Sequence, residues 1–330
     1  MSSFKILCDK KKVRPGESFP LTLEIRRRNG KTYFADEKEE ASTNLKQKQN
    51  WGDFDVIVKG GSIEKGVLYV SKDMRTFSEG KNIEVTITHK ILKKKTQKLI
   101  FPVDFNGESD FNFGGGEGFD GDKGKRGFRI FFREGVSGGS GSSGSDGING
   151  EDIVVYIKLF STEMSADTFI KVYIKSVAKD TSVVFIHNIQ KFPLKISANG
   201  GDGGDGANGG TGSNGKYARD GTNNWPGRSA GNGGDGGNGG NGGNAGNAGV
   251  ITIYIEIEAE KFLQKIKLEN KPGLAGKAGK GGYGGSGGSG SNQYPRGQDG
   301  RNGADGIPGK EGIVAPGPGI MVVEKIQVIY

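Results

Sequence analysis

The sequence contains very little cysteine and histidine, and this absence excludes two common kinds of site. Cys8 is the single cysteine among 330 residues, so the chain cannot form a disulfide within itself. His89 and His187 both lie in strand-like segments, and no cluster of Cys and His has the spacing of metal ligands. We therefore expect no metal site, and we interpret both histidines as structural residues.

Long apolar runs are also missing. Hydrophobic residues make up 32% of the chain, and no segment approaches the ~20 apolar residues of a transmembrane helix. The first residues, MSSFKILCDKKKVRPG, lack the apolar stretch of about 7–15 residues that marks a signal peptide. The sequence predicts no membrane span and no signal peptide in this chain. It leaves the compartment open among virion, cytoplasm and a mature secreted protein.

The motifs of common enzyme sites are absent or uninformative. There is no G-x-x-x-x-G-K-[ST] phosphate loop, and the many G-x-G-x-x-G matches follow from a glycine period and open no helix. Residues 200–205 match the start of a calcium-binding nonapeptide repeat, but the repeat does not continue. Carboxylates are scattered at the third position of glycine triplets, where we expect them to solvate the surface. The sequence predicts a protein that is not an enzyme and needs no cofactor.

Glycine is abundant, at 62 residues against 10 prolines, and it recurs at every third position. Six runs keep this period: 115–127, 135–150, 200–215, 231–249, 273–288 and 297–312. A period of three matches polyproline II, which has no internal hydrogen bonds and must pair with neighbours or water. A flexible linker needs no such phase, and a collagen triple helix fits poorly because the runs are short and proline is scarce. The runs predict a six-helix polyglycine II bundle with structural glycines such as Gly200, Gly203, Gly206, Gly209, Gly234, Gly237, Gly240, Gly279, Gly282 and Gly303.

The number of small residues in each triplet predicts the packing order of the runs. Runs 200–215, 231–249 and 273–288 have two small faces, so we expect them inside the bundle with neighbours on two sides. The other three runs have one glycine face and larger residues elsewhere, so we expect them at the edges.

Segments with strand character separate the glycine runs into three pairs. They span residues 151–198, 250–269 and 320–330; in the second, Ile251, Ile253, Ile255 and Ile257 alternate onto one face. Residues 1–105 contain about seven short strands, with a two-residue hairpin expected at Asn29-Gly30. We predict a mainly β fold plus polyproline II, with a domain boundary between residues 105 and 106. An N-terminal immunoglobulin-like β-sandwich would precede a small β scaffold that projects the polyglycine II bundle.

Basic residues exceed acidic ones, with a net charge of +8. Such a charge admits an anionic partner, nucleic acid or acidic polysaccharide, without naming one. The first domain has three basic clusters, which are also typical of solvated turns: Lys10, Lys11 and Lys12; Arg26, Arg27 and Arg28; Lys93, Lys94 and Lys95.

The order of paired glycine runs and strands over residues 110–330 resembles three kinds of protein. It is similar to the glycine-rich N-terminal domain of Obg GTPases, although no GTPase domain follows. It also resembles the tip adhesins of T-even-type phage tail fibres, whose stacked polyglycine II helices display receptor-binding loops. Snow flea antifreeze protein is similar in architecture, but its disulfide-capable cysteines are missing here.

Each pair of runs is expected to form a long hairpin, so that the connecting loops meet at one tip. Tyr, Trp and Arg, which are enriched at binding hot spots, occur in these loops. The predicted binding residues are Phe128, Arg129, Phe132, Arg133, Tyr217, Arg219, Trp225, Arg228, Gln293, Tyr294 and Arg296. The leading hypothesis is a non-enzymatic, adhesin-like protein that binds a protein or glycan receptor. The alternatives are an Obg-like module that binds RNA or the ribosome, an ice-binding protein, and aromatic residues that only cap the bundle.

Overall fold

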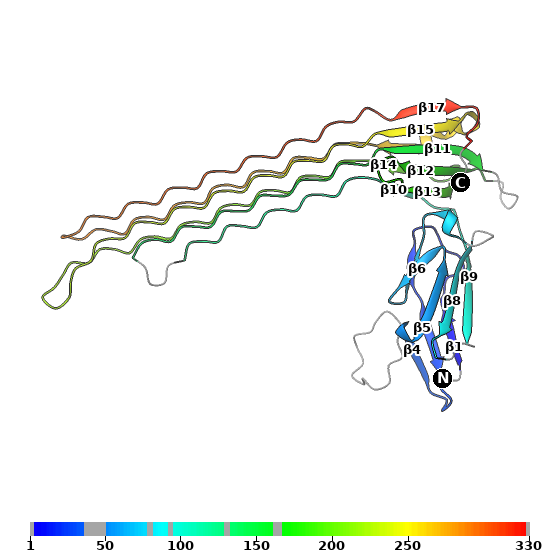
Figure 1. The fold of residues 1–330 in the computed structure, drawn as a ribbon, viewed down its shortest axis with the longest axis horizontal. Coiled ribbons are helices and arrows are strands. Elements are labelled where there is room, and N and C mark those ends of the chain that lie inside the picture. The colour runs from blue at the N-terminus through cyan, green and yellow to red at the C-terminus, as the bar shows by residue number, and fades with distance from the viewer. Residues whose placement is uncertain are drawn as a thin grey trace.

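The computed structural model describes residues 3–35, 51–77, 82–91, 95–128, 133–160 and 167–327. The fold is mainly β and consists of several small sheets with short 3-10 helices. The six glycine runs extend from one side of a β base, and the N-terminal strands lie beside that base (Figure 1).

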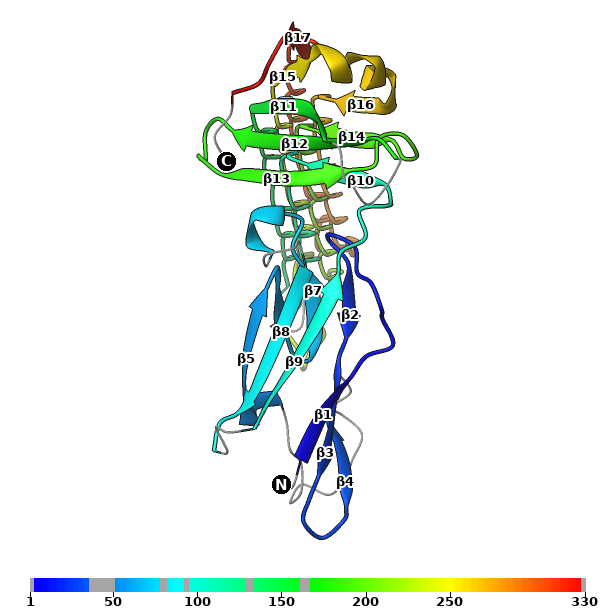
Figure 2. The same ribbon diagram turned by 90° about the vertical axis from the view of Figure 1, so that its right-hand side faces the viewer.

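The N-terminal part contains three sheets of three strands each (Figure 2). Their apolar faces enclose one core, in which Leu21, Leu23 and Ile25 are fully buried. The first sheet has β1 (Ser3–Leu7), β3 (Thr22–Arg26) and β4 (Thr32–Ala35); the second has β2 (Ser18–Pro20), β7 (Val67–Val70) and β6 (Gly61–Glu64); the third has β5 (Phe54–Lys59), β8 (Asn82–His89) and β9 (Thr96–Pro102).

The hairpin expected at Asn29-Gly30 is present, but its loop is longer than predicted. The N–H of Arg27 donates to the carbonyl of Lys31 at 2.9 Å, so three residues rather than two form the turn. Gly30 has a φ of 79°, which is the left-handed position of such a turn and favours glycine.

The base contains two further sheets that pack on each other. The first has the order β13 (Ser182–His187), β12 (Phe169–Ser176), β11 (Ile153–Phe160), β15 (Ile251–Glu256) and β17 (Gly319–Val323). The second has the order β10 (Ser109–Asn112), β14 (Leu194–Ser197) and β16 (Ile266–Glu269). Inward-facing aliphatic side chains from both sheets form one core, which includes Ile153, Val155, Ile157, Ile174, Ile196, Ile251, Ile253 and Ile255.

The two sheets of the base continue directly into the two layers of glycine runs. The first run of each pair leaves the sheet of β10, β14 and β16; these runs are 115–127, 200–215 and 273–288. The second run of each pair returns to the sheet of β11, β15 and β17; these runs are 135–150, 231–249 and 297–312. The strands that precede the outgoing runs therefore all point in one direction, and so do the strands that follow the returning runs. This explains why β11, β15 and β17 pair in parallel, as do β10, β14 and β16.

Hydrogen bonds at every third residue join the six runs, which we call the glycine array. Consecutive runs are antiparallel, as where Gly204 N–H donates to the carbonyl of Ser145 at 2.9 Å. Alternate runs are parallel, as where Gly118 N–H donates to the carbonyl of Asp202 at 2.7 Å. Each run thus bonds to the next run and to the next but one, which gives two layers of three runs.

The predicted packing order is right for four runs and wrong for two. Runs 200–215 and 231–249 bond to four other runs and lie inside, whereas 115–127 and 297–312 bond to two and lie outermost. Runs 135–150 and 273–288 bond to three runs each, so the first is less peripheral and the second less central than expected. Run 135–150 has small residues on a second face, including Gly139 and Ser142, and this allows a further neighbour to approach.

The Asp and Asn side chains of the triplets do more than solvate the surface. Six of them on run 231–249 accept backbone N–H groups of run 297–312, or of Ile313 directly after it, at 2.7–2.9 Å: Asn232, Asp235, Asn238, Asn241, Asn244 and Asn247. Asp202 and Asp205 do the same for run 273–288. The side chains thus give hydrogen-bond partners to backbone amides that would otherwise need water.

The strand predicted through residue 257 ends earlier than expected. Residues Ile257–Lys265 form the 3-10 helix η3, and the Ile257 side chain is 57% exposed. The alternating pattern therefore overstates β15 by one apolar residue, and only Ile266–Glu269 of the following segment is a strand.

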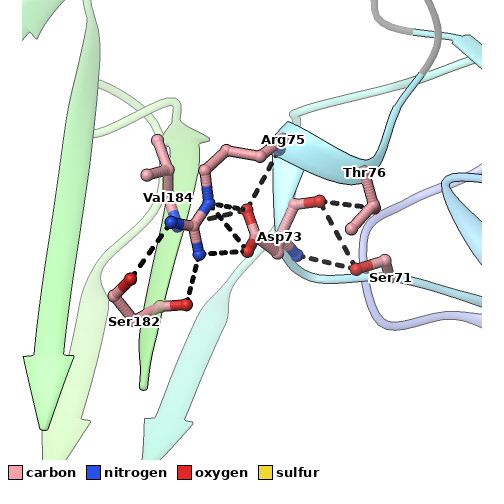
Figure 3. A network of polar contacts seen from close by, with 6 residues as sticks. All are labelled: Ser71, Asp73, Arg75, Thr76, Ser182 and Val184. Atoms are coloured by element: carbon pink, nitrogen blue, oxygen red, sulfur yellow. Dashed lines mark hydrogen bonds and ion pairs between the residues drawn. The ribbon is translucent and has the colours of Figure 1, made fainter. Parts of the chain in front are cut away.

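A polar network joins the N-terminal sheets to the base (Figure 3). Asp73 caps the 3-10 helix η2 (Met74–Thr76) by accepting the N–H of Arg75 at 3.0 Å. The Arg75 guanidinium binds Asp73 and reaches across to β13, where it donates to the Ser182 hydroxyl at 3.0 Å and to the Ser182 carbonyl. A further 3-10 helix in the N-terminal part, η1 (Trp51–Asp53), precedes β5.

Candidate recognition surface

The loops of residues 216–230 and 289–296 lie at the end of the glycine array away from the base (Figure 1). Backbone hydrogen bonds hold their bases together. Lys216 N–H donates to the carbonyl of Arg133 at 3.0 Å, and Ala218 N–H donates to the carbonyl of Ser289 at 2.8 Å. The loops are therefore neighbours, as the hairpin interpretation predicted.

The loop of residues 216–230 forms a small hairpin. Arg219 and Arg228 pair across it, and Thr222 pairs with Trp225 nearer its turn. The intervening Asn223 and Asn224 are residues that favour turns, because their short polar side chains bond to the local backbone. The hairpin thus has a defined backbone rather than an irregular course.

The loop of residues 289–296 supports this hairpin. Gly221 N–H donates to Gln293 Oε1 at 3.1 Å, and Gln293 N–H donates to Asp220 Oδ1 at 2.9 Å. The Ser291 hydroxyl and the backbone N–H of Gln293 lower the pKa of Asp220, so this carboxylate stays charged at neutral pH. The structure thus gives Gln293 a positioning role.

Tyr294 packs against the main chain of the hairpin. A Cβ at Gly227 would lie 2.7 Å from a ring carbon of Tyr294 and 2.8 Å from its hydroxyl oxygen, which explains the glycine at that position. The Tyr294 side chain is half-buried, unlike those of Phe128, Tyr217 and Trp225. It therefore fixes one loop on the other.

Three of the described aromatic side chains at this end are open to solvent. Phe128, Tyr217 and Trp225 are 77%, 75% and 67% exposed. Arginines accompany them: Arg133 lies 3.8 Å from Glu134, and Arg296 forms an ion pair with Asp299. Arg129 and Phe132, which were predicted to belong to this site, lie outside the described residues.

The basic clusters of the N-terminal part do not join this surface. Lys10 pairs with Glu17, Arg26 pairs with Glu24, and Arg27 lies over the ring of Tyr33 at 4.7 Å. Lys93 and Lys94 lie outside the described residues. Lys10, Arg26 and Arg27 thus have local partners in the N-terminal part.

A hollow of about 290 Å³ lies where the N-terminal part meets the base. Ser109, which lines it, bonds to His187 Nδ1 at 3.0 Å, and His187 Nε2 bonds to the carbonyl of Phe192 at 3.0 Å. Burial lowers the pKa of His187, so the ring is neutral at pH 7. Nε2 then donates to the carbonyl and Nδ1 accepts from Ser109, an arrangement that locks β13 to its surroundings.

Comparisons with protein-family models, curated proteins and solved structures found no match to this chain. Within the described residues, no helix is long and apolar enough to cross a membrane. Sequence reasoning predicted binding residues in these loops but missed the cross-strand pairing of Arg219 with Arg228. Their symmetric spacing about Asn223-Asn224 is the signal that would have revealed it.

Proposed function

We propose that this chain is a non-enzymatic recognition protein that presents binding loops at the tip of a rigid polyglycine II bundle. The six glycine runs would be polyglycine II helices, and residues 1–105 would form an immunoglobulin-like sandwich. The loops at the tip would bind a protein or glycan receptor.

The regular hydrogen bonding of the array favours a rigid base for these loops. Glycine loses more backbone freedom on folding than other residues, and bonds between runs offset that cost. A run of 16 residues in polyproline II geometry is about 50 Å long, so the loops would stand well away from the base.

The observation that carries the proposal is the exposure of Tyr217 and Trp225 on a hairpin that other residues already hold in place. Gln293 and Tyr294 anchor the hairpin, whereas the two exposed rings contribute little to its packing. Exposed aromatic residues beside arginines are typical of binding hot spots.

Labelled protein can be tested against a panel of defined glycans and a panel of intact cell types. On any surface that binds the parent, the double variant Tyr217→Ala, Trp225→Ala should bind at least tenfold more weakly. Tyr283→Ala is the matched control, because Tyr283 is 73% exposed on the side of run 273–288. Binding that survives in the double variant, or no binding to any panel member, contradicts the proposal.

A further inference from the structure

Arg219 and Arg228 lie directly opposite each other across the hairpin of residues 216–230. The N–H of each donates to the carbonyl of the other, at 2.8 and 2.7 Å. Residues that exchange both bonds project their side chains from the same face, with Cβ atoms about 5 Å apart. Like charges in this arrangement repel and destabilise the hairpin of the free protein.

No acidic side chain in the described part of the chain forms an ion pair with either arginine. Asp220 is the nearest acid in sequence, but it accepts the N–H of Gln293 in the neighbouring loop. Both arginines are exposed. The pair therefore offers two guanidinium groups to an external anion.

We propose that Arg219 and Arg228 together bind the anionic group of an acidic saccharide, a carboxylate or a phosphate. The proposal rests on the proposed function and names the ligand of the same surface. The planar guanidinium presents paired donors that match the oxygens of either anion. Trp225 and Tyr217, on the same hairpin, supply rigid exposed rings on which sugar rings can pack.

The surroundings favour a saccharide over larger anionic partners. Non-specific binding of single-stranded nucleic acid uses a positively charged groove that follows the backbone, whereas acidic Glu134 and Asp299 adjoin the arginines of the neighbouring loops. A stable protein interface buries about 800 Å² on each partner, which is large for one short hairpin. A few sugar units with one anionic group fit its size and charge.

Binding can be measured to immobilised polygalacturonate, which carries carboxylates, to phosphomannan, which carries phosphates, and to neutral dextran. The parent should bind at least one acidic polymer at least tenfold more tightly than dextran. The variant Arg219→Gln, Arg228→Gln should lose at least tenfold of that affinity. The control variant is Arg126→Gln, Arg301→Gln, which removes the same charge from two glycine runs. Its affinity should stay within about twofold of that of the parent.

Thermal unfolding verifies that the hairpin variant folds, and it tests the repulsion independently. At low ionic strength, added phosphate should raise the Tm of the parent more than that of the hairpin variant. Three results would overturn the proposal. The parent could bind dextran as tightly as the acidic polymers, or the two double arginine variants could lose equal affinity. The parent could also bind the RNA poly(U) more tightly than either acidic polysaccharide. If Tyr217→Ala, Trp225→Ala abolishes binding while the arginine variant does not, the proposed function stands and the anion site falls.

Discussion

At Gly240, a side chain would collide with the main chain of the neighbouring run. A Cβ placed there would meet the carbonyl of Ser142, and Gly240 N–H already donates to the carbonyl of Ala207 at 2.8 Å. The neighbouring runs cannot move apart at this point without losing hydrogen bonds to one another. Gly116 differs, because a Cβ there would meet only the end of the Ile148 side chain, at 3.6 Å.

Gly240→Ala should therefore lower the free energy of unfolding by about 1–3 kcal/mol, as overpacking does in other close-packed interiors. Gly116→Ala should change it by less than about 0.5 kcal/mol. Urea unfolding of the two variants and the parent measures the difference. Equal stability of the two variants would show that close contact between the runs does not require glycine at position 240.

The sequence predicts structural glycines at every third position of the runs, because the period is visible without a structure. It was not sufficient to assign the polar positions. From the sequence, Asp202 and Asp205 look like solvent-facing residues. Only the position of run 273–288 shows that they accept hydrogen bonds from its backbone amides. The pairing of Arg219 with Arg228 likewise depends on a turn whose position the sequence leaves open.

Among the elements, the outer edge of run 273–288 is closed by side chains of run 297–312. Asp305 Oδ1 accepts Gly281 N–H at 2.7 Å, Asn302 Oδ1 accepts Gly284 N–H at 2.9 Å, and Asp299 Oδ1 accepts Gly287 N–H at 2.7 Å. Without these acceptors, the run would present free amides to another chain, much as an open sheet edge does. The three side chains thus oppose lateral association.

The triple variant Asp299→Ala, Asn302→Ala, Asp305→Ala should associate with itself more strongly than the parent. Sedimentation velocity should show a sedimentation coefficient that rises with protein concentration. Asp299→Asn, Asp305→Asn is the matched control, since it removes the same two charges and keeps oxygen acceptors at all three positions. Association of the control as strong as that of the triple variant would assign the effect to charge.

Element boundaries were predictable only where local pattern and tertiary packing agree. The glycine runs bond to one another at every third residue, which is the spacing of their glycines. The extension of a strand to Ile257 was wrong, since apolar alternation continues into a segment that turns into η3. The predicted packing order missed a neighbour of run 135–150, because Gly139 and Ser142 give that run a second small face.

At the scale of the whole molecule, the direction of the glycine array relative to the N-terminal sheets depends on a small junction. Arg75 donates to Ser182 on β13, and Lys72 Nζ donates to the carbonyl of Asp110 on β10 at 2.9 Å. The N–H of Val184 also donates to Asp73 Oδ1 at 3.4 Å. These polar contacts therefore help to set the direction of the array.

Arg75→Ala should loosen this junction while both parts remain folded. It removes two hydrogen bonds to Ser182, which contribute roughly 1–3 kcal/mol together. Small-angle scattering should show a broader distribution of distances, and protease cleavage within residues 104–108 should accelerate several-fold. Arg26→Ala is the control, because Arg26 pairs with Glu24 within one N-terminal sheet and should leave both measurements unchanged. An unchanged scattering profile for Arg75→Ala would mean that the remaining contacts of β13 and β10 alone hold the array in its direction.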